Sequence, residues 1–196
     1  MVVDNFPKYI IFVIGIKNLF FNSEKMLYKL LLCGVSMELN QIPDFTDKLC
    51  KAKELHLDGK LDKAIAEYTS LLNRNATAEL YCLLGWAYCL NGNFIDAINQ
   101  CRFAIELDPE WGNAYNDLAC YLIYEKRFDA ALPWLEKAIQ LESYAEKHLP
   151  YYNLGRVYEK KGMWLYSKNC YEFSVSLAPD YKKAHKGLNR IYAYLK

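Results

Sequence analysis

The stretch NGNFIDAINQCRFAIELDPEWGNAY, residues 91–115, contains a turn of small polar residues, an amphipathic run, an Asp-Pro pair and an aromatic start to another segment. Similar stretches surround Gly59, Lys126 and Gly162, so the turn recurs after 33, 34 and 36 residues (59 to 92, 92 to 126, 126 to 162). A repeat of this length is typical of arrays of helix-turn-helix units. The sequence therefore predicts pairs of helices that stack one unit upon the next.

The unit from Ala78 to Trp111 shows how a pair is built. Its first predicted helix has apolar or small residues at i, i+3, i+4 and i+7, which places them on one face. These residues are Tyr81, Leu84, Gly85 and Tyr88. The corresponding face of the second helix, predicted over Phe94–Leu107, consists of Phe94, Ala97, Ile98, Cys101, Ala104 and Ile105. A glycine inside a helix costs about 1 kcal/mol relative to alanine, so Gly85 predicts a close approach of the second helix.

The other units repeat this pattern with substitutions. The third has Tyr115, Leu118, Ala119 and Leu122, then Phe128, Ala131, Leu132, Leu135, Ala138 and Ile139. The fourth has Tyr151, Leu154, Gly155 and Tyr158, then Trp164, Ser167, Tyr171, Ser174 and Val175. The first unit keeps mainly its second half. A final helix after Pro179 has one apolar side and many lysines, as expected for the cap of a solenoid.

Two departures mark the junction between the third and fourth units. Pro133 falls within the predicted second helix, where it removes a backbone hydrogen bond and distorts the helix locally. Two extra residues around Glu146-Lys147 then precede Pro150, which suits the first turn of the next helix. We expect a slight change in superhelix angle at this junction.

These residues resemble the tetratricopeptide repeat family, and in particular arrays of bacterial type. The residues that match its pattern best are Tyr81, Leu84, Gly85, Tyr88, Gly92, Phe94, Ala97, Ala104 and Pro109. The resemblance implies an all-α fold, a right-handed α-solenoid of about four helix-turn-helix units with a C-terminal capping helix. We divide the chain into an extension, 1–44, an array, 45–181, with units 45–77, 78–111, 112–147 and 148–181, and a cap, 182–196.

Composition narrows the class of function. Hydrophobic residues make up 53% and charged residues 24%, as in an ordinary globular protein. A formal net charge of +1 gives no reason to expect nucleic acid as a partner. The seven cysteines are an odd number and contain no CxxC, so we expect free thiols in a reducing compartment, the cytoplasm.

Residues 1–36 lie outside the repeat. Their apolar runs, 9–16 and 26–36, are shorter than a membrane-spanning helix, and no small-residue cleavage site follows the first. Two interpretations stay open. These residues are either a real helical extension or membrane-associating leader, or upstream sequence translated before a true start at Met37. A real apolar segment could also occupy the groove of the array.

No pattern in the sequence indicates catalysis. It contains no GxxxxGK[ST], GxGxxG, HExxH or GxSxG, and no cluster with metal-ligand spacing. His56, His148 and His185 stand apart, and a pair such as Cys120 with a distant histidine has no motif context. We therefore expect a chain that is not an enzyme and that holds no cofactor and no metal.

The resemblance implies that the first helices line a concave surface, which holds an extended peptide or a helix of a partner. The residues opposite each apolar stripe should face it. In the second unit these are Cys82, Trp86, Cys89 and Leu90, and in the third Asn116, Cys120, Ile123 and Tyr124. In the fourth they are Tyr152, Arg156, Glu159 and Lys160, and in the cap Lys183, Lys186 and Arg190.

This groove would be apolar in its middle and basic toward its C-terminal end. It predicts a partner with hydrophobic anchors next to acidic residues, or a free C-terminal carboxylate. Asn116 suits a peptide backbone and Arg190 a carboxylate. Alternatively, Trp86, Ile123 and Tyr124 pack between neighbouring first helices, and the lysines form a solvated face. The carboxylate-binding pattern of chaperone-specific repeats is matched only in part, so no chaperone clamp is predicted.

The sequence therefore predicts a non-catalytic scaffold or adaptor for protein-protein interaction. The alternative is a dedicated chaperone or assembly factor for one client, membrane-associated if residues 1–36 are a real leader.

Overall fold

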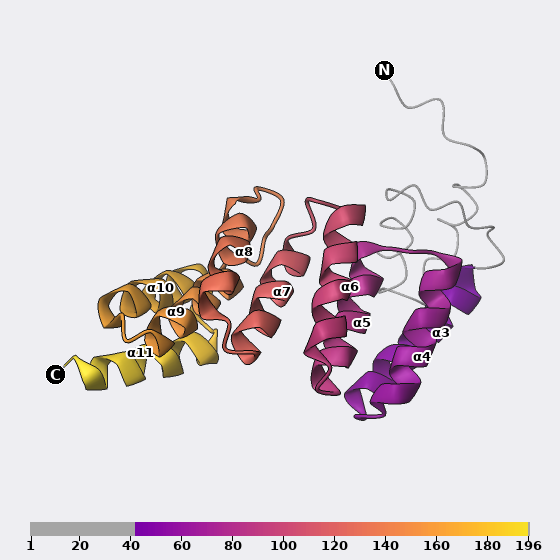
Figure 1. Cartoon of the computed structure of the whole chain (residues 1–196), viewed down its shortest axis with the longest axis horizontal. Coiled ribbons are helices and arrows are strands. Elements are labelled where there is room, and N and C mark those ends of the chain that lie inside the picture. Colours follow the sequence, from indigo (N-terminus) through magenta and orange to yellow (C-terminus); the bar gives the residue numbers. More distant parts are fainter. Residues whose placement is uncertain (1–41, 196) are drawn as a thin grey trace, which may run out of the picture. The chain divides into compact units, whose positions relative to one another are not determined.

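The computed structural model describes residues 42–195, in which every regular element is an α-helix (Figure 1). The helices are α3 (Ile42–Leu57), α4 (Leu61–Arg74), α5 (Ala78–Leu90), α6 (Phe94–Leu107), α7 (Gly112–Tyr124), α8 (Phe128–Gln140), α9 (His148–Lys160), α10 (Trp164–Leu177) and α11 (Lys182–Tyr194). The contacts between residues divide the chain into two compact units after Ile42. Apart from Ile42 itself, all of these helices lie in the second unit, Pro43–Lys196. The apolar runs and the alternative start at Met37 lie outside the described residues.

Each predicted unit is a pair of antiparallel helices joined by a short turn. Helix α5 packs on α6, α7 on α8 and α9 on α10, while α11 packs on both α10 and α9. The first pair is joined by a contact between Lys51 Nζ and Glu67 Oε1 at 2.7 Å. The first helices also contact one another in order, α5 with α7, α7 with α9 and α9 with α11. The prediction of an all-helical repeat solenoid is confirmed, and α6 begins and ends at the predicted residues.

The turns within the four pairs share one backbone conformation. Gly59, Gly92 and Gly162 have φ of 73°, 80° and 71°, in the left-handed region that glycine enters without steric cost. The third pair has Lys126 at the same place, with φ of 61°. A side chain with a Cβ is disfavoured there, so this turn is the least favourable of the four.

Glycines inside the helices allow close approach, and for Gly85 the sequence predicted it. A Cβ at Gly85 would lie 3.1 Å from the carbonyl oxygen of Ala97 on α6. A Cβ at Gly155 on α9, or at Gly187 on α11, would lie 2.6 Å from the ring of Tyr171. Tyr171 on α10 is fully buried, and its ring therefore fits between the two glycines.

The junction between the third and fourth pairs is a packed loop. Helix α8 continues through Pro133, whose side chain is exposed, and ends at Gln140. In the loop that follows, Tyr144 is buried against Gly112 at the start of α7. Ser143 Oγ donates a hydrogen bond to the carbonyl oxygen of Glu110 at 3.2 Å. The extra residues at 146–147 therefore extend a loop that folds back on the third pair.

The largest apolar core lies where the second, third and fourth pairs meet. It contains Ala97, Ile98, Cys101, Leu118, Ala119, Tyr121, Leu122, Ile123, Ala131, Leu135, Leu154 and Val157. These residues come from α6, α7, α8 and α9, so the pairs bury their stripes against one another. None of the helices between residues 42 and 195 is long and apolar enough to cross a membrane.

Candidate protein-binding face

Four large apolar side chains are exposed on the first helices of the first three pairs. They are Leu57 on α3, 79% exposed, Trp86 and Leu90 on α5, 45% and 54%, and Tyr124 on α7, 52%. We call these four residues the apolar row. Leu57, Leu90 and Tyr124 occupy one position of the repeat, since they are separated by 33 and 34 residues (57 to 90, 90 to 124). At the same position the fourth unit has Lys160, which is exposed.

Trp86 is supported from below by the first unit. Its ring lies 4.4 Å from that of His56, centroid to centroid. His56 is buried and its Nδ1 lies 3.3 Å from the hydroxyl of Tyr68. Burial lowers the pKa of His56, so its ring is neutral at physiological pH. Trp86 therefore has a packed inner side and an exposed outer side.

A series of hydrogen bonds crosses from α9 to α7. Arg156 Nη1 donates to Asn153 Oδ1 at 3.0 Å, and Asn153 Nδ2 donates to Asn116 Oδ1 at 2.9 Å. Asn116 Nδ2 then donates to Asp117 Oδ1 at 3.3 Å. Asn116 and Asn153 are buried. We call this series the polar ladder, and in it Asn116, predicted to hold a partner's backbone, bonds to neighbouring side chains.

Arg156 ends the polar ladder within an aromatic setting. Its guanidinium carbon lies 5.4 Å from the ring centroid of Tyr124 and 5.8 Å from that of Tyr152. Its Nη1 also lies 3.7 Å from the thiol of Cys120. Cation–π contacts at these distances attract the guanidinium to the two rings. Arg156 thus joins α9 to α7 at the C-terminal end of the apolar row.

Arg190 on the cap is already paired with a carboxylate. Its Nε and Nη2 donate to the two oxygens of Glu159 at 2.9 and 3.0 Å, and the hydroxyl of Tyr171 donates to the same carboxylate at 2.6 Å. Burial alone would raise the pKa of Glu159, but these hydrogen bonds outweigh it and lower the pKa. The predicted carboxylate-binding arginine therefore holds a carboxylate of its own chain. Of the other predicted cations, Lys160, Lys183 and Lys186 are exposed.

Two cysteines on this face, Cys89 and Cys120, are weakly reactive thiols. Burial raises the pKa of Cys89 to about 11 and also raises that of Cys120, although Arg156 opposes the second shift. A thiol with a raised pKa is a poor nucleophile at neutral pH. Among residues 42–195, no group of three or more His, Cys, Asp or Glu side chains could hold a metal ion.

The structure places the predicted groove residues at two depths. Cys82, Asn116 and Ile123 are buried, with Ile123 in the central core, so they support the face from below. Cys89, Cys120, Tyr152 and Arg156 are partly exposed, and the remaining predicted residues are exposed apart from the half-buried Glu159.

Sequence reasoning left out Leu57 and Asp117. Leu57 could have been found from its repeat position, which lies 33 residues before Leu90. Asp117 follows Asn116 on α7 and is half-buried. Burial raises its pKa to about 7, with the hydrogen bond from Asn116 opposing and Glu146 adding to the shift. No local pattern in the sequence reveals that burial.

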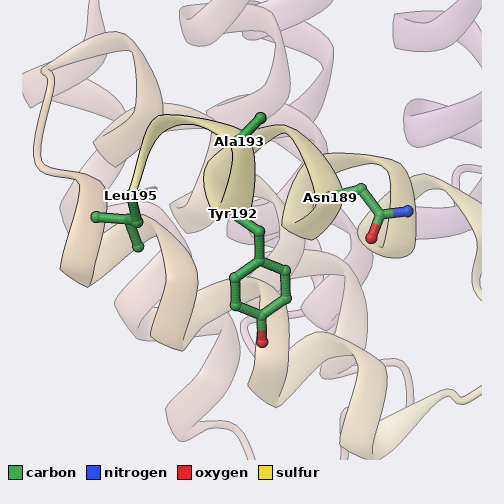
Figure 2. Close-up of a pocket in the computed structure, with 4 residues that line it drawn as sticks. All are labelled: Asn189, Tyr192, Ala193 and Leu195. Carbon is green, nitrogen blue, oxygen red and sulfur yellow. The ribbon is translucent and has the colours of Figure 1, made fainter.

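A separate shallow pocket lies along the cap (Figure 2). It is lined by Asn189, Tyr192, Ala193 and Leu195, all from α11 and its C-terminal end. Their side chains point in different directions, and the hydroxyl of Tyr192 donates to Glu172 at 3.0 Å. A site for a small ligand usually has polar groups that converge, so the first helices are the better candidate.

Comparisons with known proteins agree with this architecture. Two models of the tetratricopeptide repeat family match residues 78–110 and 111–141. A crystal structure of MamA is 28% identical, with a TM-score of 0.59, and the match covers 72% of this chain and 82% of that one. No curated protein matches the chain.

Two structures with higher TM-scores show the fold alone, because their identity is low. PilF of Pseudomonas aeruginosa is 17% identical with a TM-score of 0.71, over 79% of this chain and 70% of its own. PilW, a type IV pilus biogenesis factor, is 18% identical with a TM-score of 0.70, over 76% and 69%. The stacked helix pairs, the recurrent turns and both family matches lead to one conclusion. The chain contains tetratricopeptide repeats, and residues 42–195 are built as the scaffolds for protein-protein interaction in that family are built.

Proposed function

We propose that this chain is a non-catalytic adaptor that binds an extended or helical segment of a partner protein across its first helices. The observation that carries the proposal is the apolar row, which exposes Leu57, Trp86, Leu90 and Tyr124 on three successive first helices. Large apolar side chains gathered on one face are typical of an interaction site, and buried aromatic anchors contribute most of the affinity of such sites.

The partner segment should have apolar side chains opposite the apolar row. Toward the C-terminal end, Lys160, Lys183 and Lys186 favour acidic residues in the partner. Arg190 contributes little to this attraction, because Glu159 neutralises it. Free thiols at six described cysteines, Cys50, Cys82, Cys89, Cys101, Cys120 and Cys170, support a reducing compartment such as the cytoplasm as the place of binding.

The test uses a double variant, Trp86→Ala with Leu90→Ser, in quantitative affinity capture from a native lysate. A matched control, Ile95→Ser with Phe103→Ala, removes exposed apolar side chains from α6. Partners should bind the wild type and the control equally and lose about tenfold or more of their affinity for the double variant. Circular dichroism verifies that both variants are folded. Equal capture by all three proteins would contradict binding at the apolar row.

A second candidate function is a dedicated chaperone for one client. The apolar row favours it too, because exposed apolar surface can cover a client's unfolded segment. A chaperone's client aggregates without it, whereas a scaffold's partners fold alone. Light scattering of the captured partner, refolded with and without this chain, distinguishes the two functions.

A further inference from the structure

Three carboxylates lie along the faces where successive first helices meet. Glu79 on α5 pairs with Lys53 on α3, at 3.4 Å between Oε1 and Nζ. Glu159 on α9 pairs with Arg190 on α11, at 2.9 Å between Oε1 and Nε. In both cases the neighbouring first helix supplies the cation. Asp117 on α7 is the third, and within residues 42–195 no cation lies within ion-pair distance of it.

Among residues 42–195, the groups that interact with Asp117 include no cation. Its hydrogen bond from Asn116 Nδ2 is long, at 3.3 Å, and comes from a neutral amide. The titratable groups that interact with it are neutral thiols and phenols and one carboxylate. They are Cys89 on α5, Cys101 on α6, Cys120 and Tyr121 on α7, and Tyr144 and Glu146 in the loop before α9.

A half-buried carboxylate without a cation is unfavourable, because it loses hydration and gains no ion pair. Asp117 also lies on the face of α7 that contains Cys120 and Tyr124, since these residues follow it at i+3 and i+7. Tyr124 belongs to the apolar row. Asp117 lies two turns before Tyr124, about 10 Å along the helix axis, so a segment that extends from the apolar row toward the N-terminal end of α7 reaches Asp117.

We propose that Asp117 binds a lysine or arginine side chain of the segment that occupies the apolar row. This inference rests on the proposed function and makes the partner more specific. The segment has a basic residue among its apolar anchors, in addition to acidic residues near the cap. The partner's cation then forms an ion pair with Asp117, as Lys53 does with Glu79 and Arg190 does with Glu159.

The probe is an array of acetylated and amidated dodecapeptides with a leucine- and tyrosine-rich background. Each position in turn is lysine, arginine, norleucine or glutamate, and binding of the purified full chain is measured by fluorescence. The wild type should prefer lysine or arginine over norleucine at one position by about tenfold. The Asp117→Asn variant should lose this preference and keep its preference for apolar residues. Glu136→Gln, on the exposed side of α8, makes the same change of charge. This variant should keep both the preference for basic residues and the preference for apolar residues.

The same peptides give a second readout through pH. Burial raises the pKa of Asp117 to about 7, so the carboxylate is protonated in most molecules at pH 5.5. The preference for lysine over norleucine should therefore be strong at pH 8 and decline toward pH 5.5. In Asp117→Asn, the binding of the two peptides should stay equal across this range.

The outcomes separate this inference from the proposed function. Equal binding of lysine and norleucine peptides by the wild type, or a preference that persists in Asp117→Asn, would overturn the role of Asp117. If the wild type still selects apolar residues and the Trp86→Ala, Leu90→Ser variant does not, the proposed function stands and only the role of Asp117 falls. A wild-type chain that selects neither apolar nor basic residues would overturn both.

Discussion

Tyr171 lies fully buried between two helices that each present a glycine to its ring. An alanine at Gly187 would place its Cβ 2.6 Å from that ring, closer than real contacts allow. We expect Gly187→Ala to lower the free energy of unfolding by about 2 kcal/mol, because overpacking outweighs the gain in helix propensity.

Urea unfolding followed by circular dichroism measures this change. Asn189→Ala, on the exposed side of the same helix, is the control and should leave the stability unchanged or slightly higher. A Gly187→Ala protein as stable as the wild type would show that the Tyr171 ring has room to move.

Asp117 gives a stability effect that depends on pH. Its pKa in the folded chain, about 7, is above the ordinary value of 3.8, so folding favours the protonated form. The destabilisation begins as the pH rises through the unfolded value and is complete above the folded value. We expect Asp117→Asn to raise the free energy of unfolding by about 2–4 kcal/mol at pH 8 and to change it little at pH 4.

Urea unfolding at several pH values tests this expectation, with Glu136→Gln as the charge-matched control. A gain at pH 4 as large as that at pH 8 would mean that the asparagine stabilises the fold by something other than the removed charge.

Residue-scale features differ in how far the sequence reveals them. Gly85 inside a helical pattern predicted a close contact, and the structure has it with Ala97. The isolation of Asp117 could not be predicted, because it depends on which cations of other helices reach it. Asn116 was identified as a contact for a partner, but its bond to Asn153 depends on side-chain orientation across two helices.

At the scale of the elements, the turn of the third pair differs from the other three. Lys126 has φ of 61° where Gly59, Gly92 and Gly162 stand in the equivalent turns. We expect Lys126→Gly to raise the free energy of unfolding by about 0.5–1 kcal/mol, because glycine enters this conformation without steric cost.

Thermal or urea unfolding measures the gain. The control is Lys137→Gly, an equal change at an exposed position inside α8, which should destabilise the chain by about 1 kcal/mol. A loss of stability in both variants would indicate that the entropy of the unfolded chain outweighs the relief of the turn.

The helices themselves were well predicted, because apolar spacing and turn residues are local signals. The packing of the loop after α8 was not predicted. Tyr144 is buried against Gly112, which lies 32 residues earlier (112 to 144). No pattern near Tyr144 indicates that partner, so only the assembled structure reveals why the extra residues are accommodated there.

At the scale of the whole array, each helix pair contacts mainly the pairs next to it. Stability in such an array is approximately the sum of the units and their interfaces. The repeat positions predicted that Trp86, Leu90 and Tyr124 face a partner; all three are exposed, and the ring of Tyr124 also stacks on Phe94 of α6, at 6.0 Å between centroids. The charge of that face could not be predicted from position alone, because Glu159 neutralises Arg190 and Arg156 lies against Tyr124 and Tyr152.

The packing of Tyr171 between Gly155 and Gly187 also affects how the array responds to mechanical load. The ring contacts α9 at Gly155 and α11 at Gly187, and its hydroxyl and Arg190 hold the same carboxylate on α9. A force applied to the C-terminal end of α11 is therefore shared with α9 and α10. The last helix should resist peeling residue by residue and should detach in a single step, after which Tyr171 and Glu159 are exposed together.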